Sequence, residues 1–132
     1  MTARYTDPPS LADIEEMARE ALKTIPSELL RHTQGVVVRV DDFPDEETEK
    51  EMGLETPFDL LGLYRGVPLG EKGTGFTPHD VDMIFLYRRS LLDYWCETEE
   101  DLFGLIRHVM IHEIGHHFGL SDDDMERIEA KA

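Results

Sequence analysis

Residues 102–122 read LFGLIRHVMIHEIGHHFGLSD, and this stretch decides the fold. Apolar residues recur at helical spacing over 99–118 and lie nearly all round the helix axis: Leu102, Phe103, Leu105, Ile106, Val109, Met110, Ile111, Ile114 and Phe118. A helix that is apolar on all sides is usually buried. Thr98, with Asp101 three residues on, indicates its start, and Gly119 is the expected stop, because glycine readily takes the left-handed conformation that ends helices. The pattern predicts a buried helix against which the other elements pack.

Polar residues interrupt this helix at His112-Glu113-Ile114-Gly115-His116. His112 and His116 are four residues apart and share a helical face, so both imidazoles can reach one metal ion. Glu113 is offset from His112 by about 100°, where its carboxylate can reach a water molecule on the metal. Buried polar groups without partners cost roughly 2–7 kcal/mol, and a cation would give all three a partner. The alternative is a hydrogen-bonded cluster without metal.

A glycine and an aspartate follow at short range. Gly119 comes three residues after His116, and Asp122 comes six after it. Glycine lets the chain leave the helix sharply and double back, so that Asp122 can approach the metal from the side. Two imidazoles and one carboxylate leave a fourth tetrahedral position open, which is typical of catalytic zinc. The alternative for Asp122 is a capping or solvated acid in the run Asp122-Asp123-Asp124.

The segment HEIGHHFGLSD resembles the extended zincin motif HExxHxxGxx(H/D), which metzincins and, with Asp, snapalysins share. The short acidic chain is also similar to small bacterial zincin-like metallopeptidases. The resemblance implies a Zn²⁺ ion held by His112, His116 and Asp122, with Glu113 as catalytic base. It further implies an α+β fold with a mixed sheet, whose edge strand holds an extended peptide substrate.

Two departures from the wider superfamily stand beside this resemblance. Met125 comes sooner after the motif than the methionine of the metzincin Met-turn. In gluzincins the third ligand comes from a later helix, a part that Glu126 or Glu129 could play, although the glycine-and-aspartate spacing favours Asp122. The first functional hypothesis is a zinc metallopeptidase. The second is a non-catalytic zinc-binding zincin-fold module for protein–protein contacts.

The rest of the chain predicts one domain, 1–132, with residues 1–9 as a flexible tail. Ser10 and Asp13 indicate the start of a helix that extends to Ile25. Strands are expected at 36–40, 60–64 and 82–87, a glycine-rich loop at 66–80, and further short helices at 27–32, 90–95 and 121–129. The acidic stretch 41–55 is a solvated loop or short helix. Together these elements predict a minimal zincin-like α+β fold with a three- or four-stranded mixed sheet, in which 82–87 is the candidate peptide-binding edge.

Several other residues have chemistry worth placing. His108 lies one helical turn before His112 and is either a partner of the metal ligands or a packed helix residue. His117 points about 100° away from His116 and is expected to be structural. Possible oxyanion stabilisers are His79, Tyr87 and Tyr94. Cys96 has no zinc-spaced cysteine partner and is expected in the core.

The composition sets limits on partners and compartment. The chain has 29 acidic and 13 basic residues and a formal charge of -16, which argues against nucleic acid and anionic membranes as partners. A peptide or protein substrate remains compatible with this charge. Cys96 is the only cysteine, so no internal disulfide can form, and the start of the chain has no signal-peptide core. These features predict a cytoplasmic protein.

Overall fold

The computed structural model describes residues 7–31, 35–66 and 82–130. Within them the sheet has three strands, β1 (Val37–Asp41), β2 (Gly62–Arg65) and β3 (Met83–Tyr87). Their order is β1-β3-β2, with β1 parallel and β2 antiparallel to β3. The predicted mixed sheet and α+β class are therefore confirmed.

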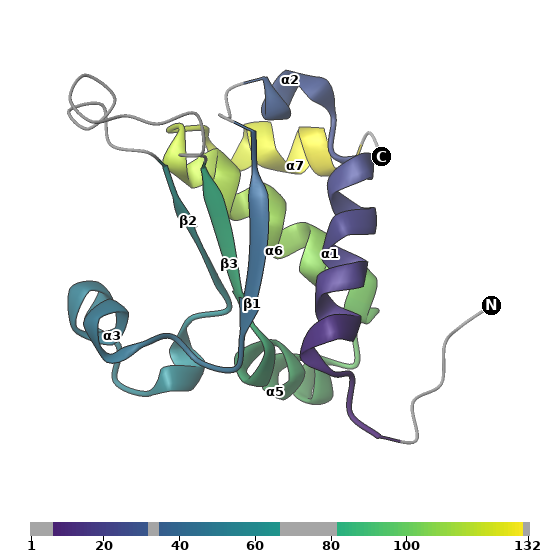
Figure 1. The fold of residues 1–132 in the computed structure, drawn as a ribbon. Helices are drawn as coiled ribbons and strands as arrows, with labels where there is room; N and C mark the ends of the chain where they lie inside the picture. The colour runs from purple at the N-terminus through teal and green to yellow at the C-terminus, as the bar shows by residue number, and fades with distance from the viewer. Residues whose placement is uncertain (1–6, 32–34, 67–81, 131–132) are drawn as a thin grey trace.

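The helices are α1 (Leu11–Thr24), α2 (Ser27–Leu30), α3 (Glu46–Met52), α5 (Arg88–Thr98), α6 (Leu102–His117) and α7 (Asp122–Ala130), with a 3-10 turn at Pro57–Asp59. Figure 1 shows α1 and α6 beside the sheet, with α3 at its other side. Helix α1 packs against β1 and α6, while α6 packs against β2 and α7. No helix in the described ranges is long and apolar enough to cross a membrane.

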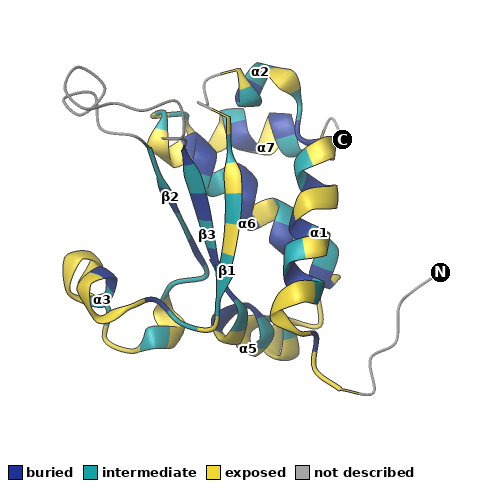
Figure 2. Ribbon diagram, viewed as in Figure 1, coloured by how far each residue is buried: buried dark blue, intermediate teal, exposed yellow. Residues whose placement is uncertain are grey.

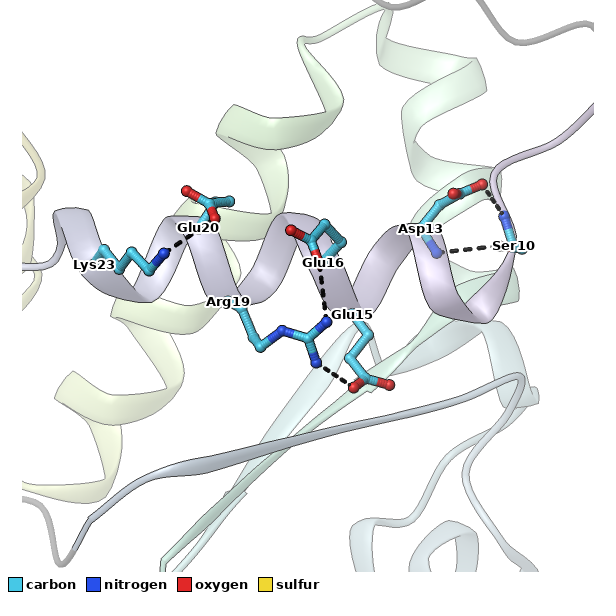
Figure 3. A network of polar contacts seen from close by, with 7 residues as sticks. All are labelled: Ser10, Asp13, Glu15, Glu16, Arg19, Glu20 and Lys23. Atoms are coloured by element: carbon cyan, nitrogen blue, oxygen red, sulfur yellow. Dashed lines mark hydrogen bonds and ion pairs between the residues drawn. The ribbon is translucent and has the colours of Figure 1, made fainter.

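Helix α1 begins where the sequence predicts. The Ser10 hydroxyl accepts from the Asp13 backbone N–H at 3.0 Å, and the Asp13 carboxylate accepts from the Ser10 N–H at 2.9 Å. This reciprocal capping box satisfies two otherwise unpaired donors. The outer face of α1 carries exposed ion pairs of Arg19 with Glu15 and Glu16 (Figure 3). Pairs this exposed contribute little to stability, so the apolar inner face holds α1 in place.

Helix α6 is the buried central element that its apolar pattern predicts. Its fully or nearly buried residues are Leu102, Leu105, Ile106, Val109, Met110, Ile111, Ile114 and Gly115. The apolar residues among them form one core with the inner face of α1 and with β3. Figure 2 shows these buried faces in dark blue. In β3, Ile84 and Leu86 are fully buried. The imidazoles of α6 are therefore mounted on a helix that the core holds from several sides.

The start of α6 differs from the prediction. Thr98 is the last residue of α5 rather than part of the α6 start, and its hydroxyl donates to the Tyr94 carbonyl. Glu99 ends α5 with φ 56°, and the Asp101 carboxylate caps α6 by accepting from the Gly104 N–H at 2.8 Å. A single residue in the left-handed conformation does not change the spacing of apolar residues. The apolar pattern therefore could not show the break between α5 and α6, and it predicted a helix that begins at 99.

Two expectations about surfaces need correction or refinement. Cys96 is exposed rather than in the core, because it lies on the outer side of α5. Pro9, at the end of the expected tail, is buried, and its carbonyl accepts from the Arg88 Nε at 2.6 Å. Residues 1–6 of that tail lie outside the described residues.

The 82–87 segment is not a sheet edge. It forms β3, which pairs with β1 on one side and β2 on the other. The strand order makes β1 and β2 the two edges of the described sheet. Strand order depends on this long-range pairing, which residue patterns within each strand do not encode.

A glycine in α6 fixes how α7 sits. A Cβ placed on Gly115 would lie 2.2 Å from the Met125 Sδ and 2.7 Å from its Cγ. Met125 is fully buried, so its side chain has little room to yield. Gly115 therefore permits the close approach of α6 and α7.

We predict that Gly115→Ala destabilises the protein by about 1–3 kcal/mol, the usual cost of overpacking a core. Gly104→Ala is the matched control, because Gly104 lies in the exposed first turn of the same helix, where alanine is the better helix former. Urea unfolding of both variants would check this. Equal stability of Gly115→Ala and wild type would contradict the packing argument.

Candidate metal centre

The end of α6 returns the chain toward its own histidines. The Gly119 N–H donates to the His116 carbonyl at 3.2 Å, and the Leu120 N–H donates to the Gly115 carbonyl at 2.9 Å. Gly119 has φ 75°, a conformation that residues with a Cβ resist. These two bonds form a Schellman motif, which satisfies the last carbonyls of α6 and turns the chain back.

Helix α7 begins directly after this turn. The Ser121 hydroxyl accepts from the Asp124 N–H at 3.1 Å and caps the helix, as the Ser121–Asp124 spacing predicts. Asp122 is the first residue of α7, and its Oδ1 lies 3.8 Å from the His116 Nε2. The glycine turn and the cap together bring the carboxylate beside the imidazole.

The structure brings His112, His116 and Asp122 together. One potential ligand atom from each lies within 4.8 Å of the others. The two imidazole rings have centroids 5.8 Å apart and planes at 79°. The side chains of His116 and Asp122 are 57% and 90% exposed, so this group faces solvent. Two imidazoles and a carboxylate at the surface form a donor set that zinc accepts, with room for a further ligand.

The ionisation of His112 suits a ligand. Burial, and then the neighbouring His108 imidazole, lower the pKa of His112, while Glu129 opposes the shift. A lowered pKa keeps the imidazole neutral at pH 7, and only a neutral imidazole offers a lone pair to a metal. The residues present therefore fit a zinc ion by the chemistry of their donors.

Glu113 lies on the more buried side of the group. Burial raises its pKa from the ordinary value of 4.5, and His116 and a backbone hydrogen bond from Tyr64 oppose the shift. In an antiparallel pair, residues that hydrogen-bond to the partner strand alternate with residues whose main-chain groups point away from it. The Tyr87 N–H donates to the Leu61 carbonyl, so Leu61 bonds to β3. In the same register, Tyr64 is one of the residues whose N–H points away from β3. The Glu113 carboxylate thus meets the outer edge of β2.

Tyr64 is a site residue that sequence reasoning missed. Its hydroxyl donates to the buried Asp82 carboxylate, and burial and this bond raise the pKa of Tyr64. Its ring lies 4.4 Å from the His117 ring, centroid to centroid. His117 therefore packs on the strand rather than joining the other imidazoles, as its offset predicts. The sequence signal for this contact is Asp82, a carboxylate directly before the apolar run of β3, which needs a hydrogen-bond partner when buried.

The remaining expected residues lie in different places. Tyr87 is buried at the end of β3, where burial raises its pKa to about 12. Tyr94 lines a pocket beside His108 and Glu129. His79 and most of the 66–80 loop lie outside the described residues. Met125 packs on Gly115 from within α7.

Comparison with known families decides the classification. The model of the zincin-like metallopeptidase family matches residues 33–132, which include the sheet, α6 and α7. The chain belongs to the zincin-like metallopeptidase family. The predicted resemblance is thereby confirmed at the level of the family, whose members usually bind zinc.

One solved structure has a fold similar to that of this chain. A solved structure, described as a conserved hypothetical protein from Thermus thermophilus, matches with a TM-score of 0.54 and 24% identity. The match covers 83% of this chain and 94% of that one. It supports the fold alone. Comparison with curated proteins gives no match.

The raised pKa of Glu113 gives a prediction for the metal-free protein. The folded state binds this proton more tightly than the unfolded chain does. The stability from protonated Glu113 is fully present below its ordinary pKa of 4.5 and is lost as the pH rises through the raised value. Glu113→Gln should therefore be as stable as wild type near pH 4 and more stable near pH 7.

Urea unfolding with a chelator present would measure this difference. Glu126→Gln is the control, because Glu126 is exposed on α7 and no such gain is expected. A Glu113→Gln variant that gains nothing between the two pH values would show that burial does not disfavour the Glu113 carboxylate.

Proposed function

We propose that this protein is a zinc-dependent peptidase in which His112, His116 and Asp122 hold the metal and Glu113 acts as general base. The observation that carries the proposal is the juxtaposition of three donor groups with a partly buried glutamate at a strand edge. A zinc ion, when bound there, supplies Lewis-acid polarisation of a peptide carbonyl and of the attacking water.

The role of Glu113 follows from its surroundings. Burial disfavours its charged form, so its carboxylate is a stronger base than an exposed glutamate. In the proposed reaction, Glu113 takes a proton from the attacking water and delivers it to the amine that leaves. A purely structural metal site has no use for a glutamate between its two histidines.

The proposed substrate is a peptide or protein segment in extended form. The Tyr64 N–H at the outer edge of β2 already donates to Glu113. We infer that the substrate pairs with the other main-chain groups that point away from β3 there, those of Gly62 and the Tyr64 carbonyl. This edge takes the place of the 82–87 segment that the sequence favoured. The solvent-facing side chains of His116 and Asp122 support an enzyme rather than a closed structural site. With Cys96 as its only cysteine, the protein is suited to the reducing cytoplasm.

The ligand role of Asp122 can be tested against its neighbour. In a Glu129→Gln background, which removes the other α7 carboxylate near His112 and is shared by the control, Asp122→Ala should weaken zinc binding by at least about 10-fold, since even partners that only orient a ligand cost 10–100-fold when removed. Asp123→Ala is the matched control, because Asp123 is an exposed acid of the same turn. Competition with a chromophoric chelator measures both affinities. If both variants lost the same zinc affinity, Asp122 would act only through its negative charge and not as a ligand.

The enzyme hypothesis depends on Glu113. Glu113→Gln keeps the size and polarity of the side chain but removes the base. We expect it to keep its zinc while hydrolysis of a peptide library falls by about 10²–10⁴-fold. Zinc content by elemental analysis and cleavage products by mass spectrometry would be measured together. Zinc-loaded wild type that cleaves no peptide would favour the non-catalytic module, and a zinc-dependent protein contact that is indifferent to Glu113→Gln would establish it.

A further inference from the structure

A second group of metal-binding side chains lies one helical turn before the first. His108, His112 and Glu129 each offer a ligand atom, and these atoms lie within 4.8 Å of one another. Helix α6 contributes both imidazoles, and the last turn of α7 contributes the carboxylate. His112 belongs to this group and also to the group with His116 and Asp122.

The distances in this group are equal to or shorter than those between the ligands of a small cation. The His108 Nδ1 lies 2.9 Å from Glu129 Oε1 and 3.0 Å from Oε2, and the His112 Nε2 lies 3.5 Å from Oε1. Ligand atoms that surround a tetrahedral zinc ion at about 2.0–2.2 Å lie about 3.3–3.6 Å apart. Small side-chain rotations therefore suffice to close all three groups on one ion.

The backbone of Glu129, which positions its carboxylate, is held in place by Arg107. The Arg107 Nη1 donates to the Glu129 carbonyl at 3.2 Å, and the Arg107 Nε donates to the Thr24 hydroxyl at 2.8 Å. Arg107 thus ties the end of α7 to α6 and α1. The two α6 imidazoles lie against each other, with ring centroids 4.0 Å apart. Both parts of the group are therefore positioned before any ion arrives.

A route from solvent reaches this group. His108 and Glu129 line a pocket of about 370 Å³. The same pocket is lined by the carboxylate residues Glu100 and Asp101, whose charge attracts cations. The His108 side chain is 50% exposed, so an ion can approach it directly.

We propose that His108, His112 and Glu129 form a second position for a divalent transition-metal ion such as Zn²⁺, which competes with the first position for His112. This inference rests on the proposed function only through the shared His112. We assign the His112 Nε2, which faces Glu129, to both positions. Because one imidazole nitrogen holds one ion, an ion at the second position withdraws His112 from His116 and Asp122. The protein then binds one ion in either of two places, and occupation of the second place leaves the proposed peptidase centre incomplete.

The test isolates each position by removing the ligands that the other does not share. In His116→Ala/Asp122→Ala only the second position is complete, and we expect one equivalent of zinc, measured by competition with a chromophoric chelator. Adding Glu129→Gln should weaken that binding by at least about 10-fold. Adding Glu126→Gln instead should not, because Glu126 is an exposed acid of the same helix. Circular dichroism would confirm that each variant is folded.

The reciprocal variant is His108→Ala/Glu129→Gln, in which only the first position is complete. We expect it to bind one equivalent of zinc, and His112→Ala to lose both positions. A folded His116→Ala/Asp122→Ala variant that binds no zinc would overturn the second position and leave the first standing. Loss of zinc only from His108→Ala/Glu129→Gln would instead remove the first position, and with it the proposed function. Two equivalents on wild type would overturn the competition.

Discussion

The turn at Gly119 determines where every candidate ligand outside α6 lies. Helix α6 supplies a stripe of imidazoles at four-residue spacing, but a helix alone holds such groups along a line. The Schellman motif ends α6 and sends α7 back across it, with Met125 seated on Gly115. Asp122 at the start of α7 then lies beside His116, and Glu129 at its end lies beside His108. The left-handed conformation of Gly119 and the absence of a Cβ at Gly115 together place α7 so that the line of histidines becomes part of two clusters.

The antiparallel strand β2 supplies the other half of the proposed chemistry. It lies against α6 so closely that a Cβ on Gly62 would meet the Val109 Cγ1 at 2.8 Å. This contact places the Glu113 carboxylate at the outer edge of β2, where it accepts from the Tyr64 N–H and is partly buried. A base strengthened by burial and a strand edge suited to an extended peptide arise from the same packing.

The features that the sequence predicted well are those encoded locally. The capping box at Ser10, the all-round apolar pattern of α6 and the stop at Gly119 depend on residues within a few positions of one another. Strand order, the boundary at Glu99 and the partner of Tyr64 depend on residues far apart or on a single backbone angle. From the sequence, Glu129 was only an alternative to Asp122 as a ligand. Its closeness to His108 could not be predicted, because it depends on how α7 docks on α6. The zincin motif predicted the family and the candidate donor groups, and tertiary packing determined the surroundings of those groups.

The exposure of the two clusters bears on how strongly they hold a metal. His112 and Glu113 are fixed by a buried helix, whereas His116 and Asp122 project into solvent and lie 3.8 Å apart. An ion that binds there must order exposed side chains, which costs part of the binding free energy. His108 and Glu129 are already in contact, so their ordering cost is smaller, but the hydrogen bond between them must be broken. Ion binding at the first position therefore costs mainly side-chain ordering, and ion binding at the second costs mainly the loss of an existing contact. Both positions use the His112 imidazole. Because α7 carries the carboxylates of both, metal binding and the docking of α7 on α6 are thermodynamically linked, and any change that loosens Met125 from Gly115 weakens both positions together.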